Sequence, residues 1–198
     1  MPSSLVMVVI LMIAVVLHEW AHAVVADRHG DPTPRAMGRL TVNPMAHIDW
    51  VGTVLVPLVS VLVMGTVWLA WAKPVPVNPR YFSNPDRVMM RVALAGPIMN
   101  LTLALGARFV MMGTGHDWNG LLSSWILINV GLMVFNLLPI PPLDGSRVIR
   151  PFLPMSAQSF LDRLDPYGLG ILLILAMMGV LNGVVWGMMR FVLQLLGL

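Results

Sequence analysis

The chain has 198 residues, of which 58% are hydrophobic and 11% are charged, whereas soluble domains carry about 25% charged residues. This composition excludes an ordinary soluble protein and indicates a polytopic membrane protein embedded in a lipid bilayer. The formal net charge of +3 gives no nucleic-acid footprint, and the absence of cysteine excludes disulfides and thiolate zinc sites.

The predicted elements are five apolar segments separated by short polar stretches. They cover approximately residues 4–26, 51–72, 88–112, 120–138 and 169–195. We expect residues 1–198 to form a single membrane-embedded domain of the all-α class. We expect about four full transmembrane helices, with residues 51–72 as a re-entrant element or a fifth crossing, because Pro57 and Gly65 interrupt that segment.

Two polar stretches flank the second apolar segment. Both are too rich in Pro, Gly and Asn to form a long helix. Within them, GRLTV (38–42) and KPVPV (73–77) have the composition of short extended segments. We therefore predict possible short β-strands at the cytosolic side, which would pair with each other.

The distribution of Lys and Arg predicts the topology. Ten of these residues follow the first segment, precede or open the third, or follow the fourth: Arg28, Arg35, Arg39, Lys73, Arg80, Arg87, Arg91, Arg147, Arg150 and Arg163. The positive-inside rule places these regions in the cytosol of a cell (inner) membrane protein and the N-terminus outside. Because both flanks of residues 51–72 are basic, re-entry is the simpler arrangement for that segment.

The first apolar segment contains the motif HEWAH. His18 and His22 are four residues apart, so on a helix they lie on one face and their imidazoles can reach one zinc ion. Glu19 lies beside them and can accept a proton from a zinc-bound water. The alternative is a polar cluster that bonds to neighbouring helices, but ionisable residues at membrane depth cost several kcal/mol and usually have a function.

A catalytic zinc site needs a third protein ligand. His29, His47 and His116 are candidates by residue type. Asp144 is the better candidate, because it ends the fourth apolar segment after three prolines and precedes Gly145, which permits a tight bend. The predicted topology brings both His18 and Asp144 toward the cytosolic ends of their segments. A plain turn aspartate is the alternative for Asp144.

Together, HEWAH and FNLLPIPPLDGSR resemble the motifs of the site-2 proteases, zinc metalloproteases that cut within the membrane. GRLTVNPMAHIDWVGT, KPVPVNP and ALAGPIMN extend this resemblance over residues 11–152, and the compact members without a PDZ or CBS domain are most similar. The resemblance implies that His18, His22 and Asp144 bind one zinc ion per chain and that Glu19 is the general base. It also implies that Asn136 holds the substrate or the oxyanion, whereas Asn100 is expected to be structural.

The predicted function is therefore hydrolysis of peptide bonds within or near transmembrane segments of membrane protein substrates. A zinc transporter is one rival, but residues 88–112 and 169–195 contain few polar side chains to form a path. A non-catalytic protein that binds membrane helices is another rival. The presence of Glu19 favours the protease.

Overall fold

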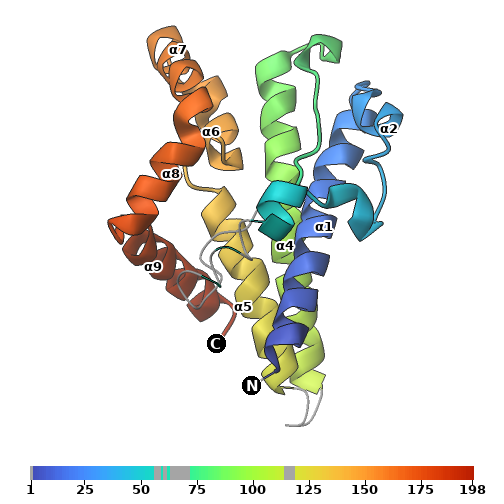
Figure 1. Cartoon of the computed structure of the whole chain (residues 1–198), viewed down its shortest axis with the longest axis vertical. Coiled ribbons are helices and arrows are strands. Elements are labelled where there is room, and N and C mark those ends of the chain that lie inside the picture. Colours follow the sequence, from blue (N-terminus) through green and yellow to red (C-terminus); the bar gives the residue numbers. More distant parts are fainter. Residues whose placement is uncertain (1, 56–58, 60–61, 63–71, 114–118) are drawn as a thin grey trace.

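The computed structural model describes residues 2–55, 59, 62, 72–113 and 119–198 (Figure 1). The α-helices are α1 (Ser4–Arg28), α2 (Thr33–Ala36), α4 (Pro85–Gly113), α5 (Asn119–Asn136), α6 (Asp144–Ile149), α7 (Met155–Leu164), α8 (Gly168–Met177) and α9 (Val180–Leu195). The 3-10 helices are η1 (Pro44–His47), η3 (Pro79–Tyr81), η5 (Arg150–Phe152) and η6 (Asp165–Tyr167), and η2 (Trp50–Leu55) is a π-helix.

Three long helices form the centre of the molecule. Helix α4 packs against both α1 and α5 and runs antiparallel to them (Figure 1). Its side chains are small at the contact with α5, where Ala104 and Ala107 lie against Ile126, Val130 and Val134. Small residues allow helix backbones to approach closely in an apolar environment, and this packing holds α1 and α5 on either side of α4.

Among the residues that the structure describes, two helices, α1 and α4, are long and apolar enough to cross a membrane. A third crossing is possible if the bent pair Met155–Met177 and Val180–Leu195 counts as one span, and Gly120–Asn136 is a shorter apolar helix. The predicted all-α class is therefore confirmed for the residues that the structure describes, and two or three of their helical stretches are candidate membrane spans. The expected count of about four spans is not confirmed. Residues 51–72 lie largely outside the described residues, so their predicted re-entry stays a prediction.

The last apolar segment is not one straight helix. Residues Met155–Met177 meet Val180–Leu195 at a bend of 84°, whereas we expected a single span over 169–195. Gly179 has a φ of 74°, a left-handed conformation that ends α8 and is easily adopted only by glycine. The bend turns α9 across α5, on which it packs.

Neither of the two predicted strands forms. Residues 38–42 and 73–77 are both described, and the structure assigns a turn and bends to the first and an irregular extended path to the second. Pro74 and Pro76 have no N–H groups, so residues 73–77 cannot form a regular ladder. Of the N–H groups nearby, those of Val75 and Asn78 donate to carboxylates, and that of Lys73 donates to the His47 carbonyl.

Candidate metal and catalytic site

Helix α1 presents the two histidines of the HEWAH motif toward α4. His18 and His22 are both buried, and their ring centroids are 4.6 Å apart in an edge-to-face arrangement. The i, i+4 spacing produces this stacking, because residues four apart lie one above the other on a helix. Glu19 is half-buried and points away from the α4 contact toward a cavity.

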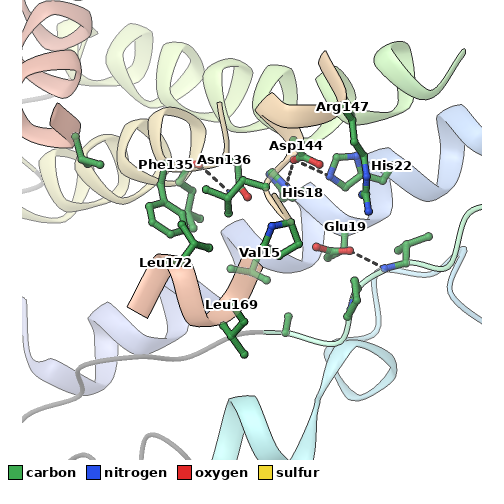
Figure 2. Close-up of a pocket in the computed structure, with 18 of the residues that line it drawn as sticks. Val15, His18, Glu19, His22, Phe135, Asn136, Asp144, Arg147, Leu169 and Leu172 are labelled. Atoms are coloured by element: carbon green, nitrogen blue, oxygen red, sulfur yellow. Dashed lines mark hydrogen bonds and ion pairs between the residues drawn. The ribbon is translucent and has the colours of Figure 1, made fainter. Parts of the chain in front are cut away.

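Asp144 reaches the histidines from the start of α6. Its Oδ2 atom lies 3.2 Å from His18 Nε2 and 3.3 Å from His22 Nε2, and its side chain is buried (Figure 2). Gly145 makes this approach possible, since a Cβ there would overlap the carbonyl oxygens of Leu137 and Leu138. The tight return of the chain after α5 thus delivers a carboxylate to the imidazoles.

Both imidazoles are oriented through their Nδ1 atoms. His22 Nδ1–H donates to the Val92 carbonyl at 2.6 Å, and His18 Nδ1–H donates to Asn100 Oδ1 at 2.6 Å. A neutral imidazole protonated at Nδ1 has a lone pair at Nε2. The Nε2 lone pairs of both rings therefore point to the same place as the Asp144 carboxylate.

This donor set fits a metal cation. Asp144 Oδ2 is buried and has no hydrogen-bond donor among the described residues. Two nitrogen lone pairs and a carboxylate oxygen repel one another unless a cation or a proton lies between them. Two His and one carboxylate are a common ligand set for catalytic zinc, with a fourth position open to water.

Glu19 is the second carboxylate near the imidazoles. Ligand atoms of His18, Glu19 and His22 lie within 4.8 Å of one another, so Glu19 is also within reach of a cation. However, Glu19 Oε2 accepts a hydrogen bond from Val75 N–H at 2.9 Å, whereas Asp144 Oδ2 faces only the two Nε2 atoms. This difference favours Asp144 as the third ligand and leaves Glu19 available for proton transfer.

A cavity of about 730 Å³ opens onto these side chains. It is lined by side chains of α1, α4, α5, α6, α8 and α9 and of residues 72–77. Figure 2 shows Asn136, Phe135, Leu169 and Leu172 around the same space. The cavity is mostly apolar and ends at the polar cluster, as expected for a site that accepts an apolar chain.

The other predicted residues lie in different places. His29 Nδ1 contacts the Val25 carbonyl, and buried His47 uses Nε2 to contact the Thr41 carbonyl, so neither reaches the cluster. His116 lies outside the described residues. Asn136 lines the cavity, and its amide donates to the Leu132 carbonyl at 2.9 Å.

Sequence reasoning missed two contributors to the site. The Val75 N–H has no side-chain signal and was not foreseeable. Asn129 of α5 is fully buried and bonds to Asn100, which itself bonds to His18. An asparagine inside an apolar segment was a signal that could have identified it.

Comparisons with known proteins agree with this geometry. The model of peptidase family M50 matches residues 6–116 and 111–179. The chain is 37% identical over 197 residues to YwhC of Bacillus subtilis, covering 93% of this chain and 85% of YwhC. It is 31% identical over 191 residues to Rip2 of Mycobacterium tuberculosis, covering 94% and 72% of the two chains. Both relatives are provisionally named zinc metalloproteases. No solved structure matches significantly.

Proposed function

This chain belongs to peptidase family M50, the site-2 proteases, and from that premise we propose that it is an intramembrane zinc metalloendopeptidase. The proposed reaction is hydrolysis of peptide bonds within or near transmembrane segments of membrane protein substrates. The observation that carries the proposal is the convergence of His18 Nε2, His22 Nε2 and Asp144 Oδ2 at one end of an apolar cavity.

The proposed ligands of one zinc ion per chain are His18, His22 and Asp144. Zinc bound there would polarise the scissile carbonyl and lower the pKa of its bound water to about 7. The protein supplies the orientation of the ligands, because each imidazole is held through Nδ1 by a group on α4. Burial keeps the three ligand atoms from competing hydrogen bonds.

Glu19 is the proposed general base. Its Oε2 atom is held by the Val75 N–H, and Oε1 then remains to accept the proton of the attacking water. The same carboxyl group can next deliver that proton to the leaving amine. The hydrogen bond to Val75 fixes the rotamer of a side chain that would otherwise be free to move in the cavity.

Asn136 is the proposed donor to the oxyanion or to the substrate backbone. Its position in the cavity wall supports this role. One N–H of the amide donates to the Leu132 carbonyl of the preceding helical turn, which orients the side chain. An amide nitrogen has two N–H groups, so the second one can donate to the oxyanion or to the substrate backbone.

The proposed orientation places the site toward the cytosolic side of the cell membrane and the N-terminus outside. The ends of α1 and α4 that carry Arg28 and Arg87 lie at the end of the bundle nearer α2 and η3 (Figure 1). Clustered basic residues at one end of membrane helices favour the cytosolic side. We also propose that residues 1–198 act as one membrane-embedded domain.

The test combines zinc content with cleavage of a single-span substrate by the detergent-purified full chain. Wild type is expected to contain about one zinc and to cleave. Glu19→Gln should keep the zinc and lose turnover, and Asp144→Ala should lose the zinc. If wild type binds zinc but cuts no substrate, with Glu19→Gln indistinguishable from it, the chain is a helix-binding protein and the protease proposal is wrong.

A further inference from the structure

Two fully buried asparagines connect His18 to the far side of the bundle. Asn100 lies on α4 and Asn129 on α5, and both side chains are 0% exposed. Asn100 Nδ2–H donates to Asn129 Oδ1 at 2.9 Å, and Asn129 Nδ2–H donates to the Trp125 carbonyl at 2.9 Å. Such groups inside an apolar bundle call for an explanation beyond packing, because apolar side chains would fill the space at lower desolvation cost.

The donor and acceptor ends of each amide in this series of hydrogen bonds are fixed. The Trp125 carbonyl only accepts, so Asn129 must turn its amide nitrogen to it and its oxygen to Asn100. Asn100 must then turn its own nitrogen to Asn129 and its oxygen to His18. The Ala14 carbonyl also faces Asn100 Nδ2, but at 3.5 Å it lies at the limit of a hydrogen bond.

We infer that Asn129 is a positioning residue for the metal centre: through Asn100 it selects the tautomer of His18 that leaves Nε2 free for zinc. This inference rests on the proposed function, in which His18 is a zinc ligand. Without Asn129, the Asn100 amide loses its best acceptor and can present its nitrogen to His18. His18 would then have to accept at Nδ1 and carry its proton on Nε2, where the metal binds.

His22 provides an internal comparison. Its Nδ1 donates to the main-chain carbonyl of Val92, which fixes the same tautomer with no side chain involved. Only one of the two imidazoles therefore depends on the asparagine pair. Residues that orient metal-bound imidazoles usually change metal affinity or activity by about 10–100-fold when removed.

A cycle of substitutions tests the inference in the full chain in detergent. Asn129→Leu is expected to weaken zinc binding about tenfold in a chelator competition assay and to alter the visible spectrum of the cobalt-substituted protein. The same substitution is then made in the Asn100→Asp variant. Both terminal side-chain atoms of the introduced aspartate are oxygens, so His18 meets an oxygen whichever way this side chain is turned. There, Asn129→Leu should leave zinc affinity unchanged within about twofold.

The controls separate positioning from packing. Ser124→Ala removes a buried hydroxyl of the same helix that donates to the Gly120 carbonyl one turn earlier, and it should not change zinc affinity. A merely structural Asn129 would lower the melting temperature and affect zinc binding equally in both backgrounds, and that result would overturn the inference. Wild-type zinc affinity in the Asn129→Leu variant would also overturn the inference. Asn129→Ala repeats the cycle if the leucine variant does not fold.

Wild type and His18→Ala measured in parallel distinguish this inference from the proposed function. If wild type takes up no zinc, or if His18→Ala binds zinc as tightly as wild type, the proposed ligand set is wrong. If His18→Ala loses zinc, but Asn129→Leu changes zinc affinity by the same factor in the wild-type and Asn100→Asp backgrounds, only the positioning role is wrong.

Discussion

Gly96 of α4 lies directly against the imidazole of His18. A Cβ atom built on Gly96 would be 2.5 Å from both Cε1 and Nε2 of His18, and 2.5 Å from His22 Nε2 as well. Real Cβ atoms do not approach other atoms so closely, so the glycine is required by the contact between α1 and α4. The backbone of α4 at Gly96 therefore packs directly against the Nε2 atoms of both candidate ligands.

Gly96→Ala should abolish tight zinc binding. The added methyl group displaces both imidazoles from Asp144, and we expect zinc affinity to fall on the order of 100-fold. Chelator competition on the purified variant measures this. Gly106→Ala is the matched control on the same helix, because a Cβ there meets no atom within 4 Å. Wild-type zinc affinity in Gly96→Ala would contradict the close approach.

Asp31 anchors the segment that contacts Glu19. Its carboxylate is fully buried and accepts hydrogen bonds from Thr33 N–H at 2.9 Å and Asn78 N–H at 2.7 Å. Asp31→Ala should destabilise the fold by about 3–6 kcal/mol, because two hydrogen bonds to a charged group are lost and each contributes about 1.5–3 kcal/mol. Hydrogen exchange at Asn78 and Val75 should accelerate. Asp27→Ala breaks an exposed pair with Arg35 and should leave both amides unchanged.

Arg108 holds the C-terminal end of α9. Its Nε–H donates to the Leu196 carbonyl at 2.7 Å, and a guanidinium nitrogen lies 3.4 Å from the Gly197 oxygen. A cation at a helix C-terminus is favourable, so Arg108→Leu should increase hydrogen exchange in the last turn of α9. Exposed Arg190 on α9 is the control, and Arg190→Leu should show the wild-type exchange pattern. Equal exchange in all three proteins would show that the contact does not hold the helix.

Removal of zinc should destabilise the protein. A ligand present at 100 times its Kd stabilises the folded state by about 2.7 kcal/mol, and the melting temperature of wild type should fall accordingly when a strong chelator is added. Asp144→Ala should melt at the same temperature with and without the chelator. A wild-type protein insensitive to chelation would mean that the cluster of His18, His22 and Asp144 does not bind metal.

Local patterns in the sequence predicted the cluster well. The i, i+4 spacing of His18 and His22 fixed their common face, and the prolines before Asp144 predicted a chain return near the end of α5. Both features depend on a few neighbouring residues, so they can be recognised without the structure. The metal-ligand roles themselves remain predictions.

The missed features depend on residues far apart in the sequence. Glu19 and Val75 are separated by 56 residues, and Asn100 and Asn129 by 29, so no local pattern relates them. The bend at Gly179 was missed because its flanks are apolar except for Asn182, and hydropathy alone counts them as one span. The predicted strands do not form because Pro74 and Pro76 lack N–H groups, and the N–H groups of Val75 and Asn78 donate to the carboxylates of Glu19 and Asp31.

Because of the bend at Gly179, the two sides of the molecule present apolar surfaces of different height to the hydrocarbon core of the bilayer. Helices α1 and α4 have 25 and 29 residues, whereas α8 has 10 and α9 turns away by 84°. At about 1.5 Å per residue, α8 spans only about 15 Å of a hydrocarbon core about 30 Å thick. Lipid beside α8 and α9 meets a shorter apolar surface than lipid beside α1 and α4. The bilayer should therefore be thinner on that side, next to the part of the cavity that α8 and α9 line.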